Sequence, residues 1–373
     1  MTDLTHATTV LTVDVEAVVA NWRRLAALVA PAEAAAVVKA DCYGLGAAHI
    51  APALLAAGCR SFFVACVEEG IHLRRFLPGG VIYVLSGPIA GSEAEFAAHG
   101  LVPVLNSLSQ ITGWSTFAKA GSLAPATAIN IDTGMNRLGL DEPELNRLVA
   151  KPAVLASVRP VLAMSHLSCA DDDSSPKNAE QLATFRRLSG QLPGFPLSLA
   201  ASSGIFLGRA YRFDMTRPGA ALYGINPIPG RPNPMAQVLS LQGKILQVRD
   251  VDSPMTVGYG ATHRVTRKGR LATVAVGYAD GWLRSLSNSG FGFIGGHKVP
   301  IVGRVSMDLT AFDVSDVPES AVYPGAMIEL IGPNRPVDDV AAEAGTIGYE
   351  ILTALGRRHH RVWLSSPREG KPA

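Results

Sequence analysis

Short apolar runs recur along the first part of the chain, and amphipathic stretches separate them. Eight such runs can be recognised, at 34–40, 61–67, 81–85, 101–106, 126–132, 161–167, 197–202 and 214–223. The stretches between them, such as 107–119 and 176–189, place apolar residues at helical spacing behind a residue that can cap a helix. Strands that alternate with helices build parallel sheets, and eight such units close into a barrel. The sequence therefore predicts an α/β fold with an N-terminal (β/α)8 TIM-like barrel.

The pattern changes near residue 237, where strand-like segments follow one another with turn residues between them. The tract 226–234 holds four prolines and a glycine and is the natural linker. We therefore predict a barrel domain over 10–233 and a mostly β domain over 237–373. Residues 1–13 contain a strand-like segment and are a candidate for pairing with the second domain.

The composition indicates a globular protein that acts on a small molecule. The 373 residues are 48% apolar and 17% charged, and the net charge of +2 gives no support to nucleic-acid or membrane binding. The four cysteines lack metal-ligand or CxxC spacing, so we expect free thiols and no metal site. No signal peptide or membrane span is recognisable, and the expected location is the cytoplasm.

Lys39 closes the first apolar run and is followed by Tyr43, Gly44 and Gly46. Partial burial at a strand end lowers the pKa of a lysine, because burial penalises the charged form. Such an amine can form a Schiff base with a carbonyl compound. The two glycines let backbone amides approach an anionic group such as a phosphate.

Polar residues end several of the predicted barrel strands, and barrel enzymes place their chemistry at these ends. The set consists of Lys39, Asp132, His166, Ser202 and Arg217. Each residue taken alone also fits a turn or a capped core position. Their placement at one predicted rim favours a functional site.

Seven segments resemble motifs of the alanine racemase family, in the family's order. They are 38–46, 131–139, 217–224, 258–262, 276–281, 303–308 and 348–352. The resemblance runs from about residue 10 to 363, nearly the whole chain. It implies a barrel that binds pyridoxal 5'-phosphate, a β domain, and a homodimer with shared active sites.

The resemblance also implies roles for individual residues. Lys39 would hold the cofactor and act as one catalytic base, and Tyr259, contributed by the other subunit, would act as the second base. Arg217 would face the pyridine nitrogen of the cofactor. The implied cofactor-binding residues are Lys39, Tyr43, His166, Ser202, Arg217, Gly219, Ala220 and Tyr349. Arg137 and Met307 would bind the substrate, and Tyr278 and Asp308 would form its entrance.

The sequence departs from the family pattern at several positions. Many members carry a lysine, reported as carbamylated, where this chain has Asn130. An amide lacks the negative charge of a carbamate, so our hypothesis is that a chloride ion binds near Asn130 and Arg137 and positions the arginine. Other departures from the residues common in the family are Asp41, Cys42, Leu45 and Ala201.

The implied activity is the interconversion of L-alanine and D-alanine, with D-alanine supplied for peptidoglycan. A racemase of broader specificity, acting on serine for example, is a first alternative. A pyridoxal-dependent decarboxylase is a second, although it would be expected to place a carboxylate where this chain offers Arg217. A non-enzymatic carrier of pyridoxal phosphate is a third, and it would have no use for the β domain.

Overall fold

The computed structural model describes residues 5–120, 126–192 and 194–365. The chain divides into two compact units. The barrel unit is Val18–Ala236, and the β unit combines Met1–Ala17 with Gln237–Ala373. Within the predicted domains, residues 121–125, 193 and 366–373 lie outside the described residues, as do residues 1–4 at the N-terminal end.

The barrel unit is built on parallel strands that follow the chain order. Seven of them form one sheet: β3 (Ala36–Val37), β4 (Ser61–Val64), β5 (Val81–Val84), β6 (Leu101–Leu105), β7 (Thr127–Asn130), β8 (Pro160–Met164) and β9 (Leu197–Ser198). β10 (Met215–Thr216) pairs in parallel with β2 (Glu33–Ala34), which leads directly into β3. A parallel bridge between Ala201 and Arg217 joins the β9 and β10 segments. The strands thus close into a ring, and the predicted fold class is confirmed.

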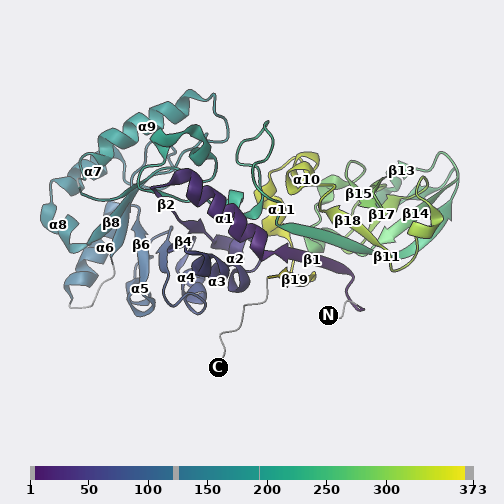
Figure 1. Ribbon diagram of the computed structural model, residues 1–373, viewed down its shortest axis with the longest axis horizontal. Coiled ribbons are helices and arrows are strands. Elements are labelled where there is room, and N and C mark those ends of the chain that lie inside the picture. The colour runs from purple at the N-terminus through teal and green to yellow at the C-terminus, as the bar shows by residue number, and fades with distance from the viewer. Residues whose placement is uncertain (1–4, 121–125, 193, 366–373) are drawn as a thin grey trace. The chain divides into compact units, whose positions relative to one another are not determined.

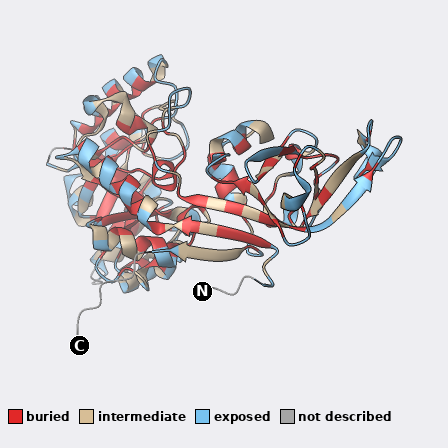
Figure 2. Ribbon diagram, turned by 45° about the vertical axis from the view of Figure 1, so that its right-hand side comes forward, coloured by how far each residue is buried: buried red, intermediate tan, exposed pale blue. Residues whose placement is uncertain are grey.

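Helices follow the strands and lie on the outside of the barrel (Figure 1). They are α1 (Val15–Val29), α3 (Ala47–Ala57), α4 (Val67–Arg74), α5 (Glu93–His99), α6 (Leu108–Lys119), α7 (Glu142–Val149), α8 (Pro152–Ser157) and α9 (Pro176–Ser189). The segment α2 (Lys39–Tyr43) is instead a tight turn, because Ala40, Asp41 and Cys42 have non-helical backbone angles. Two caps show why helices begin where they do: the Ser107 hydroxyl accepts the Gln110 N–H at 3.3 Å, and the Asp141 carboxylate accepts the Glu144 N–H at 2.7 Å. Buried residues concentrate on the strands and on the inner helix faces (Figure 2).

The last predicted barrel strand, 214–223, is much shorter than expected. Only Met215–Thr216 is a strand, and Ala220–Tyr223 forms a 3-10 helix, η3. Pro218 has no N–H to donate to a sheet, and the chain turns at Gly219 into η3. The apolar residues of η3 are buried without belonging to a strand, which is why the run looked continuous.

The β unit contains one large sheet. Its main path runs β16, β15, β18, β11, β1, β19, with β14 pairing β11 and β17 pairing β14. The strands are β1 (Thr9–Asp14), β11 (Leu239–Val251), β14 (Gly269–Val274), β15 (Phe291–Ile294), β16 (His297–Pro300), β17 (Thr310–Asp313), β18 (Met327–Ile331) and β19 (His360–Leu364). β1 pairs antiparallel with β11 and parallel with β19. The N-terminal strand therefore belongs to the sheet formed by the C-terminal part of the chain.

Two helices interrupt the β character near the end of this unit. α10 (Val337–Ala344) ends at Gly345, whose φ of 72° suits a residue without a Cβ, and α11 (Gly348–Ala354) follows. Within the described residues, no helix combines the length and the apolar character that crossing a membrane requires.

Candidate active site

Lys39 lies two residues after the end of β3, at the rim where the barrel strands end, and is partly buried. The backbone after it is unusual: Ala40, Asp41, Cys42 and Tyr43 all have φ between 52° and 55°. A left-handed conformation costs an L-residue other than glycine about 1–2 kcal/mol, so surrounding contacts must hold this turn.

Two carboxylates hold the left-handed turn. Glu69 of α4 accepts the N–H of Ala40 at 2.8 Å. Asp41 accepts the N–H of Ala47 at 2.7 Å, which fixes the turn to the start of α3. Asp41, one of the departures from the family pattern, thus has a clear local role.

The surroundings of Lys39 favour its neutral form. Burial lowers the pKa of the amine, nearby Arg137 lowers it further, and Glu69 opposes both effects. The amine is therefore easier to deprotonate than that of an exposed lysine. This is the property that Schiff-base formation requires.

Arg217 follows β10 and is almost fully buried. Its guanidinium donates to the Ser198 hydroxyl and, at 2.5 Å, to the Ser165 carbonyl. Burial lowers the pKa of Arg217 to about 10, which still leaves the group charged at neutral pH. The rim thus carries a permanent cation in a fixed orientation.

His166 follows β8 and lies beside this arginine, with Nδ1 at 3.5 Å from the guanidinium. Burial, followed by the charges of Arg217, Arg137 and Lys39, lowers the pKa of His166 to about 3, so the imidazole is neutral at physiological pH. Because arginine only donates, this contact favours the tautomer in which Nδ1 accepts and Nε2 carries the proton.

A tight cluster surrounds the Ser202 hydroxyl. Its oxygen accepts the N–H groups of Gly219 at 3.0 Å and Ala221 at 3.2 Å. A Cβ added to Gly219 would lie 2.5 Å from the Tyr43 hydroxyl, so only glycine fits there. The structure therefore brings Tyr43, Ser202 and Gly219 together, and Ala220 is the next residue along the chain.

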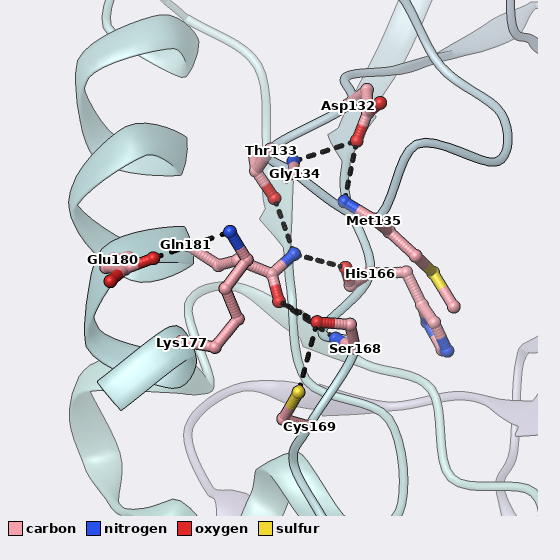
Figure 3. A network of polar contacts seen from close by, with 10 residues as sticks. All are labelled: Asp132, Thr133, Gly134, Met135, His166, Ser168, Cys169, Lys177, Glu180 and Gln181. Carbon is pink, nitrogen blue, oxygen red and sulfur yellow. Dashed lines mark hydrogen bonds and ion pairs between the residues drawn. The ribbon is translucent and has the colours of Figure 1, made fainter. Parts of the chain in front are cut away.

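Asp132 follows β7 by two residues and organises the loop that carries Arg137. One carboxylate oxygen accepts the N–H groups of Gly134 at 2.9 Å and Met135 at 3.0 Å (Figure 3). Arg137, two residues further along, is exposed. Asp132, which the sequence predicts at the rim, thus shapes the loop that follows β7.

Gln181 of α9, fully buried, joins two rim loops (Figure 3). Its amide nitrogen donates to the Thr133 hydroxyl at 3.1 Å and to the His166 carbonyl at 3.0 Å. Its amide oxygen accepts the Ser168 N–H at 2.8 Å. Gln181 was not predicted from the sequence, although its position on the buried face of α9, beside Leu182 and Phe185, is a detectable pattern.

We expect Gln181→Leu to lower the free energy of unfolding by about 2–4 kcal/mol, because buried hydrogen-bonding groups of Thr133, His166 and Ser168 lose their partner. Denaturant titration measures the change. Glu180→Gln is the matched control, since its side chain is exposed and should alter stability by no more than about 0.5 kcal/mol. Equal stability of the two variants would contradict this assignment.

The side chain of Asn130, the last residue of β7, is held by the side-chain amide of Asn106. Its Nδ2 donates to the Asn106 Oδ1 at 2.8 Å. Asn106 is buried and donates its own amide hydrogens to the carbonyls of Leu85 and Val104. The Asn130 side chain is thus fixed at the rim, with one of its two amide hydrogens directed at Asn106.

The remaining predicted site residues belong to the β unit. Tyr259 begins the short 3-10 helix η4 (Tyr259–Ala261), after β12 (Thr256–Val257), and is 72% exposed. Gly258 and Gly260 on either side have φ of 71° and 73°. The phenol thus projects from a sharply turned loop instead of packing into the core of its own unit.

Tyr278, Met307 and Asp308 lie together on the β unit. The N–H of Tyr278 donates to the Ser306 carbonyl at 3.0 Å, and the next N–H donates to the Met307 carbonyl at 3.0 Å. Tyr278, Met307 and Asp308 are exposed. Arg358 donates to Asp308 and to buried Asp280, at 2.7 Å in each case.

Tyr349 lies in the first turn of α11, in the same unit, and is partly exposed. The predicted site residues therefore form two groups, one at the rim of the barrel unit and one on exposed segments of the β unit. The rim combines an easily deprotonated lysine with a fixed cation and a serine-glycine cluster, which suits covalent binding of an anionic carbonyl compound.

Comparisons with known proteins agree with this description. The family model for the alanine racemase N-terminal domain matches residues 13–227, and that for the C-terminal domain matches 238–363. Alanine racemase from Rhodospirillum rubrum is 53% identical, with 98% of each chain covered, and that from Rhizobium meliloti is 50% identical, with 95% of this chain and 96% of the relative covered.

Solved structures give the same result. A crystal structure of alanine racemase from Bartonella henselae with covalently bound pyridoxal phosphate has a TM-score of 0.92 and 44% identity, and covers 96% of this chain and 100% of its own. The alanine racemase from Pseudomonas aeruginosa described as biosynthetic has a TM-score of 0.89 and 33% identity, and covers 96% of this chain and 100% of its own. The chain belongs to the alanine racemase family.

Proposed function

We propose that this protein is a homodimeric alanine racemase that interconverts L-alanine and D-alanine with pyridoxal 5'-phosphate held at Lys39. The observation that carries the proposal is the buried, charged Arg217 beside neutral His166 at the rim where Lys39 ends its strand. The Bartonella henselae relative, with its covalently bound pyridoxal phosphate, supports the choice of cofactor.

The rim residues fit the cofactor. Lys39 has the lowered pKa that covalent attachment needs. The Tyr43 hydroxyl, the Ser202 hydroxyl and the backbone at Gly219 and Ala220 would hold the phosphate, and the close approach of Tyr43 to Gly219 supports this role. We also assign a phosphate contact to Tyr349, on the family resemblance alone.

Bound pyridoxal phosphate would withdraw electrons from the substrate and make its Cα proton removable. Arg217 would direct an N–H at the pyridine nitrogen. Because a guanidinium keeps its proton, that nitrogen would stay unprotonated, and electron withdrawal would be weaker than with a carboxylate partner. A weak electron sink favours prompt return of a proton over side reactions. His166, neutral and beside Arg217, would orient the arginine.

Racemisation needs a proton removed from one face of Cα and returned to the other. We assign the amine of Lys39 to one face and the phenol of Tyr259 of the partner subunit to the opposite face. The high exposure of Tyr259 on its glycine-flanked loop supports a role toward another subunit, because its own unit does not bury it. Two bases let the enzyme work in either direction.

The substrate carboxylate would be held by Arg137 and the backbone at Met307, both exposed. We place Tyr278 and Asp308 at the substrate entrance. The pairing of the Tyr278 and Met307 segments supports these roles, because it holds the two side by side within the β unit.

We further propose that a chloride ion positions Arg137. The Asn130 amide is held at the rim and offers a second hydrogen, beyond the one given to Asn106, that can meet an anion. We expect racemisation to slow in chloride-free buffer and to recover when chloride is added. Asn130→Ala is the matched variant and should lose this response. An unchanged rate in chloride-free buffer would contradict the chloride proposal.

The comparisons disfavour two of the three alternative functions given above. Membership of the family, with both of its domains matched, favours an isomerase over a carrier or a decarboxylase. A broader racemase that also accepts serine stays open, because it would use the same residues. Supply of D-alanine for peptidoglycan in the cytoplasm is our proposal for the biological role.

A further inference from the structure

Glu69 is a residue to which the reaction scheme gives no role, yet it contacts the backbone that carries Lys39. It lies in the first turn of α4, the helix that follows β4. One carboxylate oxygen accepts the N–H of Ala40 at 2.8 Å, and the other accepts the N–H of Ala65 at 2.8 Å. The carboxylate therefore joins the ends of two neighbouring barrel strands.

Ala40 is the first residue of the left-handed turn that follows Lys39. A backbone conformation of this kind persists only where surrounding contacts determine it. A charged acceptor on a backbone N–H is among the stronger hydrogen bonds available. Glu69 is thus well placed to fix both the turn and the lysine at its start.

We propose that Glu69 is a positioning residue for Lys39, whose carboxylate clamps the turn after the lysine and sets the charge balance at its amine. This proposal rests on the proposed function, in which Lys39 holds the cofactor and moves a proton. Such a lysine must be neutral in order to attack the cofactor and must accept a proton from the substrate.

The groups around Lys39 within the barrel unit explain why a carboxylate is useful there. Arg137 and burial favour the neutral amine, whereas Glu69 favours the charged one. His166 is neutral at physiological pH, and Arg217 adds a second cation beside it. Glu69 therefore offsets part of the effect that burial and Arg137 have on the protonation of Lys39.

The test compares Glu69→Gln, Glu69→Asp and the control Glu68→Gln. Glutamine keeps the shape but loses the charge, and its NH2 group cannot accept the second backbone N–H. Aspartate keeps the charge but is too short to reach both amides. Glu68 is the exposed neighbour on the same helix, so its variant controls for the loss of one surface charge.

Each protein is stripped of cofactor and mixed with pyridoxal phosphate across a range of pH. The rate at which the absorbance of the lysine-bound cofactor appears reports the protonation of Lys39, and titration gives the cofactor Kd. We expect Glu69→Gln to shift the midpoint of the pH profile to lower pH and to raise the Kd about tenfold, equivalent to about 1.4 kcal/mol. Glu69→Asp should keep the midpoint near that of the unaltered protein but still weaken binding.

A Glu69→Gln profile that matches the Glu68→Gln profile would overturn the proposal. So would a loss of thermal stability without any shift of the midpoint, since Glu69 would then serve folding alone. Borohydride reduction and peptide mapping of the unaltered protein distinguish this failure from a failure of the proposed function. Cofactor found on a lysine other than Lys39 would reject the function, whereas cofactor on Lys39 leaves the variants as the test of Glu69.

Discussion

Lys39→Ala should abolish the absorbance of the lysine-bound cofactor and lower racemisation by about 10³ or more, because the variant loses both the covalent anchor and one of the two bases. Absorbance spectra of the purified protein with added pyridoxal phosphate measure the first effect. Conversion of L-alanine measures the second.

Lys151→Ala is the control for this prediction, because Lys151 is exposed and lies at the start of α8. It should keep the spectrum and the activity of the unaltered protein. If the absorbance survived in Lys39→Ala, another lysine would be the anchor and the site would have to be reassigned.

Tyr259→Phe should leave cofactor binding nearly intact while racemisation falls by about 10² or more, the size expected for loss of a general acid–base group. The substitution removes only the hydroxyl, and the exposed side chain contributes little to the core of its unit. Tyr323→Phe, at another exposed tyrosine of the β unit, is the matched control. Near-normal turnover of Tyr259→Phe would reject the two-base assignment.

Mixing the two inactive variants tests whether subunits share their sites. A dimer with one Lys39→Ala chain and one Tyr259→Phe chain would contain one intact pair of bases if Tyr259 serves the partner's Lys39. After random reassortment we expect recovery of about a quarter of the normal activity. No recovery, with mixed dimers present, would place both bases in the same chain.

The barrel was predictable because its pattern is local and repeats. Apolar strands and capped helices alternate along the sequence, and each pair signals the same architecture. The rim position of Lys39, His166 and Arg217 followed from that architecture, since polar residues at strand ends meet on one side of a barrel. The structure places Arg217 and His166 in contact, as this reasoning requires.

Other features depend on contacts that no local pattern encodes. Ala40 and Cys42 have no preference for left-handed backbone, so the turn after Lys39 could not be foreseen, and neither could the role of Glu69 in holding it. The predicted strand 214–223 was too long because burial alone made Ala220–Tyr223 resemble a strand. Gln181 was overlooked because the polar residues on the buried face of α9, which include Asn178 and Ser189, interrupt the apolar pattern of that face.

Chiral chromatography of the protein loaded with pyridoxal phosphate tests the central claim most directly. The protein is incubated separately with L-alanine, L-serine, L-lysine and L-arginine. Our account predicts that D-alanine forms from L-alanine far ahead of any other conversion. Loss of L-alanine to an amine, or no conversion at all while the cofactor stays bound to the lysine, would contradict it.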